Sequence, residues 1–201
     1  MKSKKIFKAT FLVMVITIAS RFLGLIRDSL VAYYFGAGAI TDAYKAAVMV
    51  PETLFTIIGL GVSTVFIPML SKIRYRDSKE KMFEFANNVI GLLIIMSLCI
   101  FVLGNIFTES IVNIIAPGFS KENMELAISL TRISLINLLF MSVNVCFLSM
   151  LQVCEDFVIP SILGMFFNAP IILYLIIFKD VNILGVTIAN VIGNILRVVV
   201  Q

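Results

Sequence analysis

The sequence predicts an all-α, polytopic membrane protein, a bundle of six transmembrane helices. Of its 201 residues, 60% are hydrophobic and only 14% are charged, and the mean hydropathy is +1.06. Soluble domains have about 45–50% apolar and about 25% charged residues. The excess also lies in long apolar blocks, and a block of about 20 residues is enough to cross a bilayer as a helix.

The first apolar block follows a basic N-terminus and predicts an uncleaved spanning helix over residues 8–36, with Gly24 as a point where it could bend. A basic start, an apolar core and the small residues Ala19 and Ser20 leave a secretory signal as an alternative. Apolar residues resume after Arg21, which favours the uncleaved helix. The lysines at its start predict a cytoplasmic N-terminus, because positive charge prefers that side.

The second apolar block predicts a helix over residues 42–70 that follows a glycine-bearing turn at 35–41. It is too long for one untilted span of about 20 residues. Pro51, Gly59 and Gly61 lie inside it, and a proline removes a backbone hydrogen bond from a helix. We therefore expect a kink or break in this helix, with Glu52 directly beside the proline.

The rest of the chain predicts four more spans and no internal repeat. The basic loop 72–81 is expected in the cytoplasm. The connector 108–123 is expected outside, with a short interfacial segment that ends near Pro117 and Gly118. A single membrane domain over residues 1–201 follows, and its last four predicted helices cover residues 83–107, 124–153, 158–178 and 183–201.

Charged residues stand out within the first two apolar blocks. A charge at the centre of a membrane helix costs about 2.5–3.5 kcal/mol on insertion scales, so such residues usually face a bundle interior or a wet cavity. Their concentration on two successive helices predicts a polar cavity between these helices. The residues are Arg21, Arg27, Asp28, Asp42, Lys45 and Glu52.

The arginines allow two interpretations. Arg21 and Asp28 are seven residues apart and share a helix face, whereas Arg27 points roughly 120° away from Arg21. A cationic pocket for an anionic head group is one interpretation, because the planar guanidinium matches phosphate oxygens. In the other, Arg27 and Asp28 extend to the membrane interface and Arg21 pairs with an acid.

Glu52 and the Asp42–Lys45 pair also have alternative roles. A carboxylate beside a mid-membrane proline could bind a proton or pair with an arginine. The alternative is a purely structural partner for Arg21. Asp42 and Lys45 are three residues apart at a helix start, where a surface ion pair is the simpler interpretation.

Several classes of function lack the residues that they need. The chain has no histidine, and its three cysteines show no CxxC spacing, so neither a metal site nor a cofactor is predicted. No nucleophile, base and orienting group occur together, so we expect no enzyme. The basic residues flank apolar runs rather than cover a soluble module, which argues against a nucleic-acid partner.

Residues 20–68 resemble the N-terminal signature of the MurJ/MviN family of bacterial lipid II flippases, within the MOP exporter superfamily. The resemblance rests on SRFLGLIRD at 20–28, FGAG at 35–38, TDAY at 41–44, Pro51, and the string from Gly61 to Pro68. It implies a transporter that moves lipid-linked peptidoglycan precursor from the inner to the outer leaflet of the bacterial cytoplasmic membrane. This ordered set is far more specific than any one of its pieces.

The resemblance also implies an architecture and a binding site. Family members have a second lobe across a central cationic cavity, so this chain corresponds to the N-terminal lobe, with the C-terminal lobe or a second chain as a partner. Arg21, Arg27 and Asp28 would line the cavity, with the arginines on the diphosphate of lipid II. Asp42 would lie near its outer end. The chain has Glu52 and Phe55 where the family often has asparagine and arginine.

Two other functions stay open at this point. The chain could export another polyprenyl-linked glycan or a drug, although drug export would favour acids over arginines in the pocket. It could also be a truncated, non-transporting membrane scaffold. In every case membrane lipids are expected partners.

Overall fold

The computed structural model describes residues 2–201, except for the side chains of residues 2–6, 8, 9, 57, 58 and 63, and it is all-helical over this range. Its helices are α1 (Lys2–Phe35), α2 (Ala39–Gly61), a π-helical turn (Val62–Phe66), α3 (Ile67–Arg76), α4 (Lys79–Ile106), α5 (Thr108–Ile115), α6 (Lys121–Ser134), α7 (Asn137–Val153), α8 (Val158–Ile177) and α9 (Ile183–Val199). The predicted all-α membrane bundle is confirmed.

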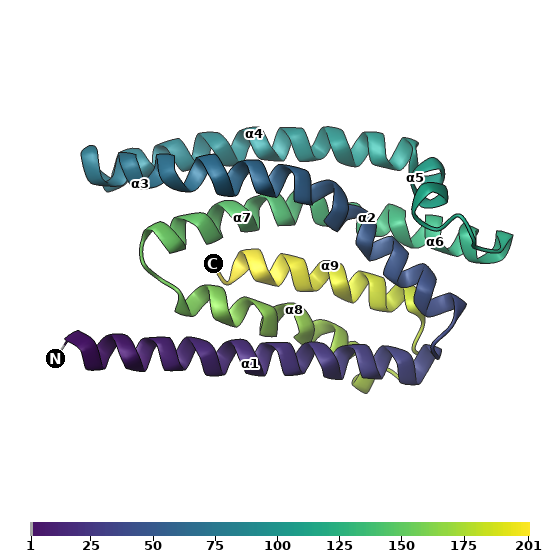
Figure 1. Cartoon of the computed structure of the whole chain (residues 1–201). Coiled ribbons are helices and arrows are strands. Elements are labelled where there is room, and N and C mark those ends of the chain that lie inside the picture. The colour runs from purple at the N-terminus through teal and green to yellow at the C-terminus, as the bar shows by residue number, and fades with distance from the viewer. Residues whose placement is uncertain (1) are drawn as a thin grey trace.

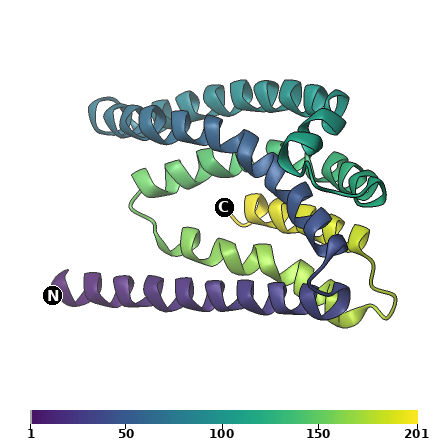
Figure 2. The ribbon, with the colours of Figure 1, turned by 45° about the vertical axis from the view of Figure 1, so that its right-hand side comes forward.

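The helices form a layered bundle with α1 at one edge and α4 at the opposite edge (Figure 1). Between these edges lie α8, α9 and α7, and the C-terminus ends inside this middle layer (Figures 1 and 2). Helix α1 packs chiefly on α8, and α4 packs chiefly on α7. Helix α2 starts beside α1 and crosses towards α4, contacting α6, α7 and α9 on its way (Figure 1). This oblique path leaves space between α1 and the first half of α2.

Local sequence signals explain where several helices begin. Ser78, Ser120 and Asn182 precede α4, α6 and α9, and each side chain accepts a hydrogen bond from a backbone N–H of the first turn. Asp156 does the same for α8, because its carboxylate accepts from the N–H groups of residues 158 and 159. Such caps satisfy donors that a helix start leaves unpaired.

The breaks within helices agree in part with the expected ones. Helix α1 is one straight helix, without the bend that Gly24 allowed (Figure 1). Helix α2 continues through Pro51, and regular α-helix ends only at the π-helical turn after Gly61. Within that turn the Thr64 hydroxyl donates to the Leu60 carbonyl at 2.8 Å. This bond satisfies a carbonyl near the irregular turn and explains how the turn is tolerated in an apolar helix.

Four segments are long and apolar enough to cross a membrane. Helices α6 and α7 together make a fifth, bent by 42° at residues 135–136, where a single helix over 124–153 was expected. Helix α9 is apolar but has 17 residues, so the sixth span remains a prediction. The four segments are Thr10–Phe35, Ala39–Arg76, Lys79–Ile106 and Val158–Ile177.

Candidate functional site

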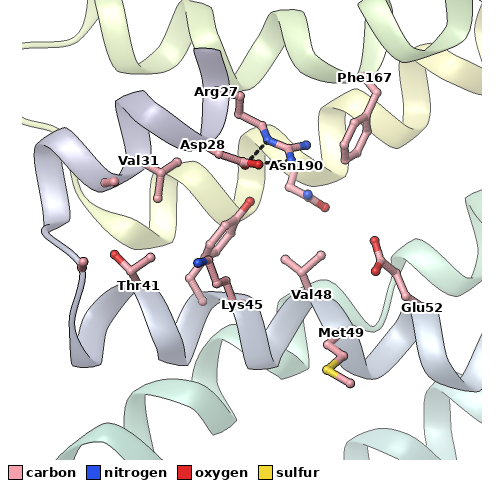
Figure 3. Close-up of a pocket in the computed structure, with 13 residues that line it drawn as sticks. Arg27, Asp28, Val31, Thr41, Lys45, Val48, Met49, Glu52, Phe167 and Asn190 are labelled. Carbon is pink, nitrogen blue, oxygen red and sulfur yellow. Dashed lines mark hydrogen bonds and ion pairs between the residues drawn. The ribbon is translucent and has the colours of Figure 1, made fainter. Parts of the chain in front are cut away.

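A cavity of about 350 Å³ lies between α1 and α2, with side chains of α8 and α9 at its far side (Figure 3). Its wall combines four charged side chains with aromatic, aliphatic and amide groups. The lining residues are Arg27, Asp28, Val31, Ala32, Ala37, Thr41, Tyr44, Lys45, Val48, Met49, Glu52, Phe167 and Asn190. The predicted polar cavity between the first two helices is therefore present.

The turn between α1 and α2 brings these helices alongside one another. Gly36 has a φ of +73°, a left-handed conformation that glycine adopts without steric cost. The Thr41 hydroxyl donates back to the Gly36 carbonyl at 2.6 Å and closes the turn. Helix α2 starts at Ala39, so Thr41 lies in its first turn. The result is that α2 returns across the polar face of α1.

Arg27 is held in place by partners on two helices. Its Nε and Nη2 atoms contact Oδ1 of Asp28 at 2.9 and 2.8 Å, and its Nη1 donates to Oδ1 of Asn168 on α8 at 3.0 Å. Asn168 is buried, and its Nδ2 donates to the carbonyl of Gly164 at 2.8 Å, which fixes the amide orientation. The guanidinium therefore reaches the cavity already oriented by α8 (Figure 3).

Phe167 contacts two arginines. The Cζ atom of Arg27 is 5.5 Å from the ring centroid, and the Cζ atom of Arg197 is 5.1 Å from it. Both distances are within the range of cation–π attraction. Arg197 lies in the last turn of α9, and its buried Nε has no hydrogen-bond partner among the described residues.

A close contact between α8 and α9 explains where Arg197 lies. Gly193 is one helical turn before Arg197, so both are on the same face of α9. A Cβ atom at Gly193 would lie 2.5 Å from the carbonyl oxygen of Phe167. Only glycine allows this approach, and the approach brings the Arg197 guanidinium to the Phe167 ring.

Helix α2 supplies the opposite wall. Lys45 and Glu52 both line the cavity, and their separation of seven residues places them on one face of the helix (Figure 3). The side chain of Glu52 projects into the cavity, which Arg27 lines from the opposite wall. Arg21, which the sequence suggested as a structural partner of Glu52, does not line this cavity.

The structure separates the predicted site residues into three places. Arg27, Asp28 and Glu52 share the cavity. Asp42 instead lines a neighbouring groove between α2 and the connector that follows α5. Arg21 is exposed on α1 and is not among the residues that line the cavity.

A buried amide network supports the cavity from behind. Asn190 on α9 lines the cavity and is 2% exposed, and its Oδ1 accepts a hydrogen bond from Nδ2 of Asn137 on α7 at 3.0 Å. Asn194 donates to the backbone carbonyl of Asn190 at 3.3 Å. The Asn137–Asn190 bond links α7 to α9. Amide bonds between helices are typical of membrane bundles.

The sequence missed Arg197, Phe167 and the cavity role of Asn190. A basic residue near the end of the last apolar block was the one available signal for Arg197. Phe167 is one of 17 phenylalanines and carries no local signal of its role.

Comparison with known proteins shows the family. Residues 31–201 match the family described as lipid II flippase MurJ. The chain belongs to this family. A flippase moves a lipid between leaflets without transforming it, which agrees with the expectation of a protein other than an enzyme.

Individual relatives agree over nearly the whole chain. It is 32% identical over 197 residues to a probable lipid II flippase MurJ of Aquifex aeolicus, a match that covers 96% of this chain and 39% of the relative. It is 32% identical over 189 residues to the lipid II flippase MurJ of Thermosipho africanus, covering 94% and 39%. The chain thus spans about two-fifths of the length of these relatives.

A solved structure shares the fold. The chain superposes on a lipid II flippase MurJ in an inward closed conformation with a TM-score of 0.81 and 32% sequence identity. The match covers 94% of this chain and 40% of that one. A family of membrane flippases and several apolar helices long enough to span a bilayer together show a multi-pass membrane protein.

Proposed function

We propose that this protein is part of a lipid II flippase of the bacterial cytoplasmic membrane. It moves the lipid-linked peptidoglycan precursor from the inner to the outer leaflet. The observation that carries this proposal is the cavity in which Arg27 is oriented by Asp28 and Asn168, in a chain of the MurJ family. A guanidinium with a fixed orientation in an apolar bundle is suited to the diphosphate of such a lipid.

In the proposed mechanism, residues 1–201 form one lobe of six spans with a cytoplasmic N-terminus. A second lobe faces the cavity, and the two lobes rock about a midplane site to expose it to each side in turn. Arg27 and Arg21 bind the diphosphate, with Arg21 six residues and about 9 Å further along α1. Asp28 and Asp42 form ion pairs with basic residues and gate access to the cavity. Glu52 is a site for a proton or an ion pair.

A reconstituted transport assay tests this proposal. The complete natural protein is placed in liposomes, and the movement of lipid II between leaflets is compared for the parent and for Arg21→Ala and Arg27→Ala. We expect each substitution to abolish transport while membrane insertion is retained, because each removes a cation from the diphosphate. Arg132 is exposed on α6 outside the cavity, so Arg132→Ala is the matched control. Parent-level transport by either variant would remove that arginine from the mechanism.

A second candidate is export of another polyprenyl-diphosphate glycan. Glu52 and Phe55 favour it, because they replace the asparagine and arginine of the usual family pattern and make the pocket less cationic. Native mass spectrometry of the purified protein separates the two candidates through the co-purified lipid. A bound muropeptide lipid would support lipid II, and another lipid-linked sugar would keep the mechanism and change the substrate.

A further inference from the structure

The charges around Phe167 are unevenly paired. Arg27 has a direct ion pair with Asp28 at 2.8 Å. Arg197 lies against the same ring, and among the described residues no carboxylate is within 4.0 Å of its guanidinium. Its Nε is shielded from solvent and has no hydrogen-bond partner there. A cation in an apolar bundle needs a compensating anion, since its desolvation is costly.

Glu52 is the anion placed to compensate it. Its side chain projects from α2 into the cavity, and Arg27 and Phe167 project into the same cavity from the other side (Figure 3). Glu52 and Arg27 line the same cavity, and the Cζ atom of Arg197 lies 5.1 Å from the centroid of the Phe167 ring that lines it as well. Glu52 nevertheless forms no direct ion pair with a described residue, so a ligand that enters the cavity has no such ion pair of Glu52 to break.

We propose that Glu52 is a built-in counter-ion that competes with the anionic ligand for Arg27 and Arg197. This inference rests on the proposed function, because it names a regulator of the same site. Without the diphosphate, Glu52 compensates the positive charge of Arg197, because among the described residues Asp28 pairs only with Arg27. A diphosphate displaces the carboxylate and binds beside the Phe167 ring, which both guanidiniums contact. When the diphosphate leaves, Glu52 takes its place again.

The competition has a direct physical consequence. A carboxylate near the two arginines partly neutralises their charge and repels a second anion, so it lowers the affinity of the cavity for any other anion. It also accelerates release, because the departing anion is replaced at once. A transporter needs this property, since a ligand that binds too tightly on one side of the membrane is not released on the other. Glu52 therefore lowers the affinity for the diphosphate. Arg197 raises this affinity and is a further binding residue.

A binding experiment tests the competition. Undecaprenyl diphosphate is titrated into the complete natural protein in detergent and followed by native mass spectrometry, with undecaprenol as the uncharged probe. We expect Glu52→Gln to bind the diphosphate about three- to fivefold more tightly, the effect of removing one partly exposed charge interaction. Arg197→Gln is expected to weaken binding, and in an Arg197→Gln background Glu52→Gln is expected to have a clearly smaller effect. Affinity for undecaprenol should not change.

Matched variants control for non-specific charge effects. Glu125 is exposed on α6 and does not line the cavity, so Glu125→Gln should leave diphosphate affinity unchanged. If Arg197→Gln is not stably folded, Arg197→Met replaces it, because methionine removes the charge and its flexible side chain fills the space beside Phe167. A smaller effect of Glu52→Gln in that background would again support the competition.

The outcomes separate this inference from the proposed function. Suppose that the parent protein prefers the diphosphate to undecaprenol. Unchanged or weaker diphosphate binding by Glu52→Gln would then overturn the counter-ion role of Glu52 and leave the proposed function intact. Weaker binding would assign Glu52 to a cationic group of the ligand instead. An equal effect of Glu52→Gln with and without Arg197 would overturn the role of Arg197. A parent protein with no preference for the diphosphate would overturn both the proposed function and this inference.

Discussion

The cavity and the interface between α4 and α7 both contain polar side chains of apolar helices. The two regions differ in whether these side chains have hydrogen-bond or ion-pair partners. At the interface the hydroxyls of Ser97 and Ser142 are fully buried and bond to each other, and Ser142 also donates to the carbonyl of Leu138 at 2.8 Å. In the cavity, Lys45 and Glu52 have no direct ion pair among the described residues. The interface is complete without a ligand, and the cavity is not.

This difference separates polar groups that hold the bundle together from those available to a ligand. Buried polar groups without partners are costly, so a bundle retains them where they have another role. The interface hydroxyls lie one helical turn from buried apolar side chains, namely Leu93 on α4 and Leu138 and Cys146 on α7. The charged cavity side chains border open space of about 350 Å³. Substitutions should therefore change stability at the interface and binding at the cavity, and the variants below test this separation.

The largest effect is expected at Gly193, where one substitution should change both stability and diphosphate binding. In Gly193→Ala the new Cβ would lie 2.5 Å from the Phe167 carbonyl oxygen, so α8 and α9 must move apart. Overpacking of this kind lowers the free energy of unfolding by about 1–3 kcal/mol. The same movement displaces Phe167 from its two arginines, so diphosphate affinity should fall as well. Thermal unfolding in detergent and native mass spectrometry measure the two effects.

Gly91→Ala is the matched control for this variant. Gly91 is exposed on α4, and a Cβ atom added at this position would meet no neighbouring side chain or helix within 4 Å. The free energy of unfolding should therefore rise by about 0.5–1 kcal/mol, since alanine favours a helix over glycine, which is opposite in sign to the effect of Gly193→Ala. Equal stability of Gly193→Ala and the parent would contradict the tight α8–α9 contact.

A smaller effect is expected for the amide pair behind the cavity. Asn137→Leu removes the hydrogen bond to Asn190, and we expect a loss of about 1 kcal/mol of unfolding free energy. Asn190→Leu removes the same bond, so the double variant should lose less than the sum of the two single losses. Unfolding of all four proteins in one detergent measures this coupling. Strictly additive losses would show that the two amides do not stabilise each other.

The sequence predicted the parts of the site that are conspicuous within an apolar block. Arg27, Asp28 and Glu52 could be selected because ions are rare in membrane helices, and the glycine-bearing turn indicated that the first two helices run back on each other. The positions of the helices also followed from apolar block lengths. These signals are local, so one sequence is enough to find them.

The remaining features depend on packing between segments far apart in the chain. Asn168 orients Arg27 across 141 residues, and no local pattern pairs these two positions. Phe167 and Arg197 come together through the close approach at Gly193, which the apolar pattern of α9 does not reveal. The 42° bend between α6 and α7 likewise leaves the apolar block unbroken, so the sequence predicted one helix there.

The smallest effect is expected at the α4–α7 interface. In Ser97→Ala the partner Ser142 keeps its hydrogen bond to the Leu138 carbonyl, so no buried hydroxyl loses its last partner. We expect a loss of about 0.6 kcal/mol of unfolding free energy, a typical value for a hydrogen bond between membrane helices, and unchanged diphosphate affinity. Ser110→Ala, on an exposed position of α5, is the control for a serine without such a contact. A change in diphosphate affinity without a change in stability would contradict the separation of the packed interface from the binding cavity.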